Sequence, residues 1–101
     1  MTCTPGQINA TYALLKFCRE HNHSGNWIEC TSECLTSLET GDEDNVRRCV
    51  HLMWHAGMGS FMDWYPEVAH PHEDQRYVDA TWNALLGYWM EQMQPFKPKR
   101  R

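Results

Sequence analysis

Residues 56–65 read Ala-Gly-Met-Gly-Ser-Phe-Met-Asp-Trp-Tyr, and this stretch interrupts a sequence whose pattern is otherwise helical. Glycines let the backbone adopt a positive φ or approach another surface closely. The rings of Phe61, Trp64 and Tyr65 that follow need apolar partners in this fold or in another protein. The stretch therefore predicts a tight crossing that packs three rings on a helical bundle. Alternatively, the stretch forms a surface patch that binds a partner protein.

Apolar residues recur at three- and four-residue steps on both sides of this stretch, which is typical of amphipathic helices. Thr4, Pro5 and Gln7 form a capping box with proline at the first helical position. They predict a first helix that ends in the polar run 20–25. The predicted buried stripe of this helix consists of Ile8, Thr11, Tyr12, Leu15 and Cys18.

A second helix is expected to begin at Ser24 or Asn26 and to stop at Gly41. Its predicted stripe is Trp27, Ile28, Thr31, Cys34, Leu35 and Leu38. Acids at 42–44 favour the positive end of a third helix, which is expected to end at Ala56-Gly57. Its predicted buried face is Val46, Cys49, Val50, Met53 and Trp54.

Pro71, Glu73 and Asp74 predict the start of a last and longest helix, which continues to about Gln94. Its predicted stripe is Val78, Thr81, Trp82, Leu85, Tyr88 and Trp89. No strand-like alternation is present. We therefore expect an all-α, single-domain antiparallel four-helix bundle over residues 1–94, with an irregular Gly/Met/aromatic crossover before the last helix. Residues 95–101 are expected to form a basic, disordered tail.

The 101 residues carry their charge unevenly. Residues 1–94 hold all 13 acids and a net charge of −8, whereas residues 97–101 add +4. An acidic body argues against nucleic acid as a ligand and suits a basic protein partner. No signal peptide or membrane span is readable, so we expect a cytoplasmic protein with no membrane partner. Five cysteines without a Cys-x-x-Cys pair are expected to be reduced.

Several motifs together resemble a family of short bacterial helical proteins of unknown function. The family pattern is a helical pair, a Gly-Asp turn, another helix, and then a Gly-Met-Gly-Ser-aromatic/Leu-x-Asp loop. The matching residues are Trp27, the Gly41-Asp42 turn, the run 57–63, Asn83, Leu85 and Leu86. The resemblance covers residues 12–94, implies a helical fold, and brings no catalytic residue with it.

The histidines offer an alternative reading as a metal site, for which zinc is the expected ion. Two histidines four apart on a helix share one face, and zinc is held by imidazole and carboxylate groups. The candidate ligands are His51, His55, His70, His72 and Glu67. The glutamate that metalloproteases place directly after the first histidine is absent, because Leu52 stands there. The main expectation is therefore that no cofactor is bound.

The cysteines and the glycine loop could each form a chemically active site, but the sequence argues against both. Cys18, Cys30, Cys34 and Cys49 could form a four-thiolate site, but their positions on the helix stripes favour packing. Cys49 faces the predicted core, which argues against a Cys-His nucleophile. The run 57–60 follows a helix and lacks the lysine of a phosphate loop.

The function expected from the sequence is that of a non-enzymatic inhibitor that occludes a macromolecular partner, as immunity proteins and mobile-element or phage inhibitors do. Methionines and aromatic rings make adaptable interface anchors, and acids steer a basic partner. The candidate partner-binding residues of the loop are Met58, Phe61, Met62, Trp64 and Tyr65. The acidic face that would steer the partner is either Glu39, Asp42, Glu43 and Asp44 or Glu67, Glu73 and Asp74. Besides the metal-dependent hydrolase or metal-binding protein, an oligomeric scaffold remains an alternative.

Overall fold

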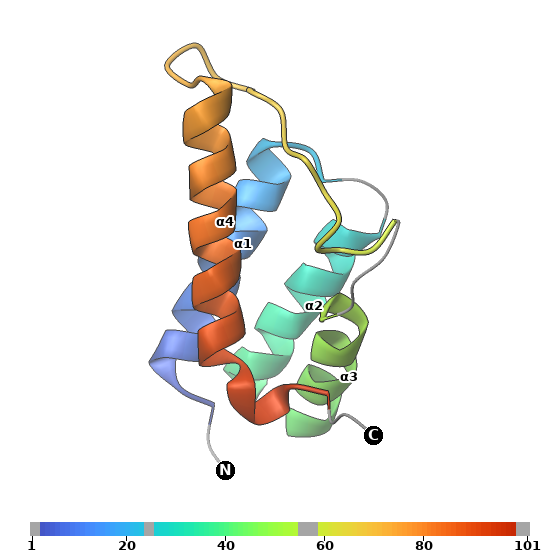
Figure 1. Cartoon of the computed structure of the whole chain (residues 1–101). Helices are drawn as coiled ribbons and strands as arrows, with labels where there is room; N and C mark the ends of the chain where they lie inside the picture. The colour runs from blue at the N-terminus through green and yellow to red at the C-terminus, as the bar shows by residue number, and fades with distance from the viewer. Residues whose placement is uncertain (1–2, 24–25, 55–58, 99–101) are drawn as a thin grey trace.

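The computed structural model describes residues 3–23, 26–54 and 59–98, and over these residues the chain contains helices and no strand (Figure 1). The elements are α1 (Pro5–Glu20), α2 (Trp27–Thr40), α3 (Glu43–Met53), α4 (Gln75–Gln92) and a short 3₁₀-helix, η1 (Gln94–Phe96). The prediction of an all-α fold with four helices is therefore confirmed.

Helices α1 and α2 each have two helical neighbours, and α1 packs against both α2 and α4. Consecutive helices run in opposite directions, and α2 also packs against α3 (Figure 1). The short η1 turns back from the end of α4 and contacts α3. Residues 59–70 cross the upper part of the bundle to reach the start of α4 (Figure 1). No helix in the described ranges is both long and apolar enough to cross a membrane.

The helix starts follow the local sequence signals. Gln7 N–H donates to Thr4 Oγ1 at 3.1 Å, and Thr4 N–H donates to Gln7 Oε1 at 2.9 Å, so the predicted capping box is present. Gly41 ends α2 with φ 78°, a conformation that glycine adopts at low cost. Asp42 caps α3 by accepting from Asn45 N–H. The side chain of Asn26 makes no capping hydrogen bond.

Two helix boundaries differ from the sequence prediction. Helix α3 ends at Met53, with Trp54 as the C-cap, before the predicted stop at Ala56-Gly57, which lies outside the described residues. Helix α4 begins after Asp74, whose carboxylate accepts from Tyr77 N–H at 2.8 Å. A carboxylate at the N-cap satisfies a backbone donor that no helical carbonyl reaches, which places the start at Asp74 rather than at Pro71.

The buried face of α1 is wider than the predicted stripe. Tyr12, which the pattern assigned to the core, is 56% exposed, whereas Leu14 and Phe17 are buried. Because α1 lies between α2 and α4, it buries residues on two sides rather than along a single stripe. Tyr88 of α4 is likewise exposed, although it was predicted to be buried.

Aromatic rings fill the space beneath the crossing segment. Phe61 is fully buried, and its ring lies 5.7 Å from that of Trp82. Trp89 is also fully buried, and its indole N–H donates to Thr11 Oγ1 at 3.1 Å. Gly59 adopts φ 80°, so at least one glycine of the predicted crossing is required by backbone conformation.

Ordered packing continues past residue 94. Phe96 is fully buried in η1, and the guanidinium of Arg47 lies 5.3 Å from the centre of its ring. The expected boundary between a domain over 1–94 and a tail over 95–101 is thus too early. The reason is that Phe96 supplies apolar area that closes the gap between α3 and α4. Residues 99–101 lie outside the described residues.

Candidate functional site

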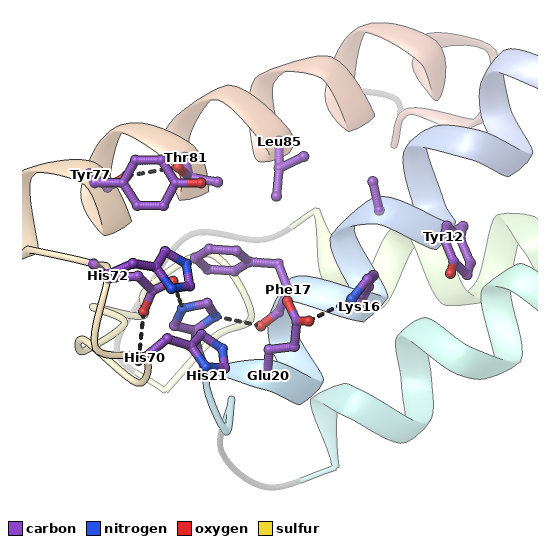
Figure 2. A pocket seen from close by; sticks show the side chains of 12 residues that line it. Tyr12, Lys16, Phe17, Glu20, His21, His70, His72, Tyr77, Thr81 and Leu85 are labelled. Atoms are coloured by element: carbon purple, nitrogen blue, oxygen red, sulfur yellow. Dashed lines mark hydrogen bonds and ion pairs between the residues drawn. The ribbon is translucent and has the colours of Figure 1, made fainter.

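A pocket of about 410 Å³ lies between α1 and the first half of α4 (Figure 2). The loop before α4 supplies His70, His72 and Glu73 to it, while Tyr77 and Thr81 come from the α4 wall. The pocket combines aromatic surface with titratable groups. Its lining consists of Tyr12, Ala13, Lys16, Phe17, Glu20, His21, His70, His72, Glu73, Tyr77, Thr81 and Leu85.

His21 occupies the C-cap of α1, and its ring orientation is fixed by its neighbours. Its backbone N–H and its ring Nδ1 both lie 3.0 Å from the carbonyl oxygen of Phe17. The ring stacks on that of Phe17 with centroids 4.0 Å apart. Only 2% of the His21 side chain is exposed. The end of α1 therefore presents Nε2 of His21 in one direction, toward the loop before α4.

Glu73 meets that nitrogen from the opposite element. Its Oε2 lies 2.9 Å from His21 Nε2, while its Oε1 accepts the backbone N–H groups of Ala69 and His70 at 3.0 and 3.1 Å. Only 4% of the Glu73 side chain is exposed. Both carboxylate oxygens are thus hydrogen-bonded, and the turn over 69–73 is closed around them.

The protonation state follows from the partners. A carbonyl oxygen and a carboxylate only accept, so His21 makes both hydrogen bonds only when both ring nitrogens carry a proton. Burial alone would raise the pKa of Glu73, but the N–H of Ala69, the His21 ring and the N–H of His70 together lower it to about 2. Glu73 is therefore a buried carboxylate that faces His21 Nε2.

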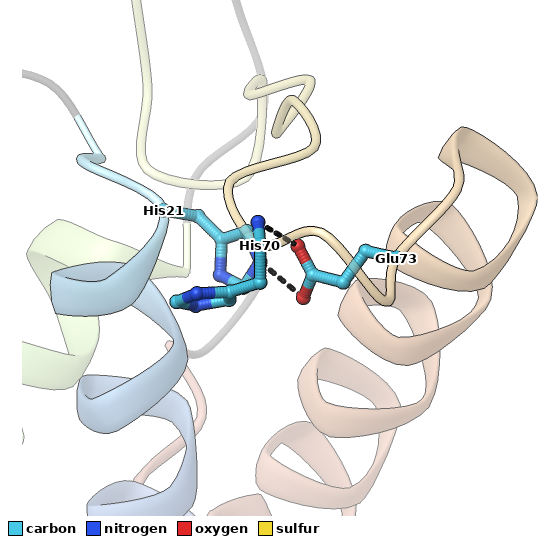
Figure 3. A group of neighbouring side chains, drawn as sticks. All are labelled: His21, His70 and Glu73. Atoms are coloured by element: carbon cyan, nitrogen blue, oxygen red, sulfur yellow. Dashed lines mark hydrogen bonds and ion pairs between the residues drawn. The ribbon is translucent and has the colours of Figure 1, made fainter.

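His70 and His72 extend this pair toward solvent. The ring of His70 stands edge-on to that of His21 with centroids 5.6 Å apart, and His72 stacks nearly parallel to His70 at 5.6 Å. His21, His70 and Glu73 offer ligand atoms that all lie within 4.8 Å of one another (Figure 3). Over the described residues, this is the one group of three or more possible metal ligands.

The predicted histidine site is different from this group. His51 is exposed on α3 and joins no group of candidate ligands in the described part of the chain. Helix α3 ends at Met53, and His55, which was expected to share a helical face with His51, lies outside the described residues. His70 and His72 do line the pocket, whereas the exposed Glu67 lines another one.

The predicted aromatic patch divides into buried and exposed parts. Phe61 is fully buried, so it is wrong as a partner-binding residue; its carbonyl oxygen accepts from His23 Nε2 at 2.9 Å. Met62 and Trp64 are half-buried against the core. Tyr65 is 83% exposed and is not packed on the bundle as predicted. Met58 lies outside the described residues.

The predicted acidic residues lie at two separate ends of the bundle. The turn between α2 and α3, with Glu39, Asp42 and Asp44 exposed, is at the lower end of Figure 1, opposite the crossing segment; Glu43 there is half-buried. Glu67 and Asp74 are exposed near the upper end. The two groups of acids, which the sequence offered as alternative faces, are therefore separate surfaces.

Glu73 is wrong as a steering residue, because its carboxylate is buried in the pair with His21. Asp74 is exposed, but its carboxylate is engaged in capping α4. Sequence reasoning treated the run 20–25 only as the end of a helix and missed His21 altogether. A histidine in a polar run carries no local signal of burial, and its partner is distant in sequence.

All five cysteines are free. Burial raises the pKa of the Cys18 and Cys34 thiols to about 12, as expected of packed side chains. Cys30 and Cys49 share a hydrogen bond, which raises the pKa of Cys49 and lowers that of Cys30. No three cysteines in the described chain converge as a metal site requires. The structure therefore supports a packing role for the cysteines.

Comparison with known proteins gives a single result. No curated protein and no solved structure matches the chain. Residues 20–74 match a family described as a domain of unknown function. The match begins at the last residue of α1 and ends at the N-cap of α4, so it includes both His21 and Glu73. The chain therefore belongs to the family named Domain of unknown function (DUF6966).

Proposed function

We propose that this protein is a non-enzymatic, cytoplasmic binding protein that occludes a basic surface of another protein, as an immunity protein or a mobile-element or phage inhibitor does. The observation that carries the proposal is the exposure of Tyr65 at 83%. Tyr65 is the most exposed large hydrophobic side chain of the described residues, and tyrosine is among the residues enriched at interface hot spots.

The backbone around Tyr65 is held in place, which matters because a pre-organised anchor loses less entropy on binding. Gln75 Nε2 donates to the carbonyl oxygen of Pro66 at 2.8 Å, and Pro66 is buried. On the other side, the ring of Trp64 packs edge-on against Trp82 at 4.9 Å. Tyr65 therefore projects from a fixed segment.

The surroundings of Tyr65 favour a cationic partner. It lies between two pockets of about 290 and 430 Å³, of which the first contains Asp79 and the second Glu67. Neither pocket has a lysine or arginine among its described lining residues. An arginine or lysine from a partner could place its cation over the Tyr65 ring and pair with either carboxylate.

Photo-cross-linking from this position tests the proposal. A benzophenone amino acid replaces Tyr65 in one variant and the exposed Tyr88 of α4 in a matched control, in cells that express the protein. We expect a discrete cross-linked product from position 65 and none from position 88. Equal patterns at the two positions, or a product whose mass is that of two copies of this chain, would contradict a separate protein partner.

The identified partner then allows a test of the acids. Glu67→Gln with Asp79→Asn should slow association on the order of tenfold at low salt, because two charges beside the anchor are removed. Asp44→Asn, at the opposite end of the bundle, is the matched charge control and should leave the association rate unchanged. An equal loss in both variants would show that only net charge matters.

A further inference from the structure

The side chains of His21, His70 and Glu73 come from two different elements, and their possible ligand atoms all lie within 4.8 Å of one another (Figure 3). His21 comes from the end of α1, and the other two come from the turn before α4. Tetrahedral zinc with bonds of about 2.0–2.2 Å places neighbouring ligand atoms about 3.3 Å apart. His21 Nε2 and Glu73 Oε2, at 2.9 Å, are already near that separation.

The atoms behind these ligands are arranged as they are in metal sites. A metal-binding histidine usually donates its other ring N–H to a carbonyl or carboxylate, which fixes the ring. His21 Nδ1 has such a partner in the carbonyl oxygen of Phe17, 3.0 Å away. Ligating carboxylates are themselves hydrogen-bonded, and Glu73 Oε1 accepts two backbone N–H groups. The two remaining atoms, His21 Nε2 and Glu73 Oε2, face each other.

The third and fourth coordination positions face the pocket. His70 is half-buried and lies on the turn, so its side chain can move toward the other two ligands while the backbone stays fixed. His72 stacks on His70 and faces the same pocket of about 410 Å³. A fourth ligand can therefore be His72 or a water molecule. Two imidazoles and one carboxylate form a donor set that suits zinc and neighbouring divalent transition metals.

We propose that His21, His70 and Glu73 form a binding site for a divalent transition metal ion of the zinc class, which cross-links the end of α1 to the start of α4. The proton between His21 Nε2 and Glu73 Oε2 marks the place of the ion. On binding, that proton leaves to solvent and two metal–ligand bonds replace one hydrogen bond. His21 also lines the pocket of about 430 Å³ beside Tyr65, but the inference rests on the geometry of the three ligands and does not depend on the proposed function.

Metal binding to the purified full chain tests the site. Zinc titration should give one equivalent bound and should raise the melting temperature, because an ion that binds only the folded state stabilises it. His70→Ala should weaken zinc affinity at least about tenfold, since even supporting residues of metal sites contribute that much. His51→Ala removes an exposed histidine outside the site and should leave affinity and the melting-temperature rise unchanged. Equal affinity of these two variants would overturn the proposal.

The free cysteines require a second readout, because thiolates also bind zinc. Cobalt substitution distinguishes the ligands, since sulfur ligation produces an intense near-ultraviolet charge-transfer band that imidazole and carboxylate do not. We expect visible d–d bands without that sulfur band, and we expect Cys30→Ser to leave the spectrum unchanged. A sulfur band, or the absence of cobalt and zinc binding at protein concentrations typical of calorimetry, would contradict the assignment.

Discussion

Nε2 of His21 lies 2.9 Å from Oε2 of Glu73 and thereby joins residues 52 positions apart in the chain. His21 is the C-cap of α1, and Glu73 directly precedes the N-cap of α4. The contact therefore joins the C-terminal end of α1 to the N-terminal end of α4. Both side chains are almost fully buried. Leaving one charge of a buried pair without its partner is strongly unfavourable.

Glu73→Gln should therefore lower the thermal stability of the protein by several degrees or more. The variant keeps the size of the side chain but removes the negative charge that faces the His21 ring. The matched control is Glu67→Gln, which neutralises an exposed carboxylate on the same segment and should leave the melting temperature unchanged. Equal melting temperatures for the two variants in circular dichroism would show that the pair does not stabilise the fold.

A second buried hydrogen bond should be equally measurable. Thr11 and Trp89 are both fully buried, and the indole N–H donates to Thr11 Oγ1 at 3.1 Å. Thr11→Val preserves the shape but leaves this N–H without an acceptor, which should cost about 1–3 kcal/mol in the free energy of unfolding. Thr36→Val, at an exposed position of α2, provides the control for threonine replacement. A Thr11→Val variant as stable as wild type by urea unfolding would contradict this assignment.

Signals within a few residues were sufficient to predict the helices. The capping box of Thr4 and Gln7, the stop at Gly41 and the acids that open α3 all act through backbone groups one turn away. The same limited reach explains the errors. Tyr12 was assigned to the core because one stripe was assumed, whereas the neighbours of α1 on two sides decide which residues are buried.

The candidate site was predictable only in part. His70 and His72 were identified as candidate ligands because they lie in the loop that follows the histidines of the third predicted helix, but His21 pairs with a residue 52 positions away. Similarly, Phe61 and Tyr65 are both large rings in one segment, and only the course of the crossing chain decides that Phe61 is buried and Tyr65 exposed. Such long-range relationships leave no periodic pattern in the sequence.

Substitutions near the C-terminus test whether residues after 94 belong to the folded domain. Phe96→Ala removes a fully buried ring and should reduce the free energy of unfolding by about 3–5 kcal/mol. Lys97→Ala changes the next residue, whose ammonium lies 5.7 Å from the ring centre of Trp54, and should cost no more than about 1 kcal/mol. If Phe96→Ala unfolds at the same denaturant concentration as Lys97→Ala, residues after 94 do not contribute to the core.

The thiols should differ in their rates of alkylation. The hydrogen bond from Cys49 lowers the pKa of Cys30, and the thiolate is the reactive form, so modification of Cys30 should begin at lower pH than for an ordinary thiol. Cys18 and Cys34, with pKa values raised to about 12 by burial, should remain unmodified in the folded protein at neutral pH. Iodoacetamide labelling followed by peptide mass spectrometry measures the order.

Removal of the hydrogen-bond donor provides the control for this order. Cys49→Ala should shift the pH dependence of Cys30 alkylation upward, because the thiolate of Cys30 loses the group that stabilises it. An unchanged profile in this variant, or labelling of Cys18 before Cys30 in the wild-type protein, would contradict the assigned contact.

Substitutions of Tyr65 and Phe61, which lie in one segment, should differ in their effect on the free energy of unfolding. Tyr65→Ala replaces a side chain that is 83% exposed and should change the free energy of unfolding by less than about 0.5 kcal/mol. Phe61→Ala removes a ring that stacks on His23 at 5.1 Å in the interior and should cost about 3–5 kcal/mol. Chemical denaturation of both variants measures the difference. If Tyr65→Ala destabilised the protein as much as Phe61→Ala does, the exposed ring would have a structural role, and its loss could not be used to map a binding surface.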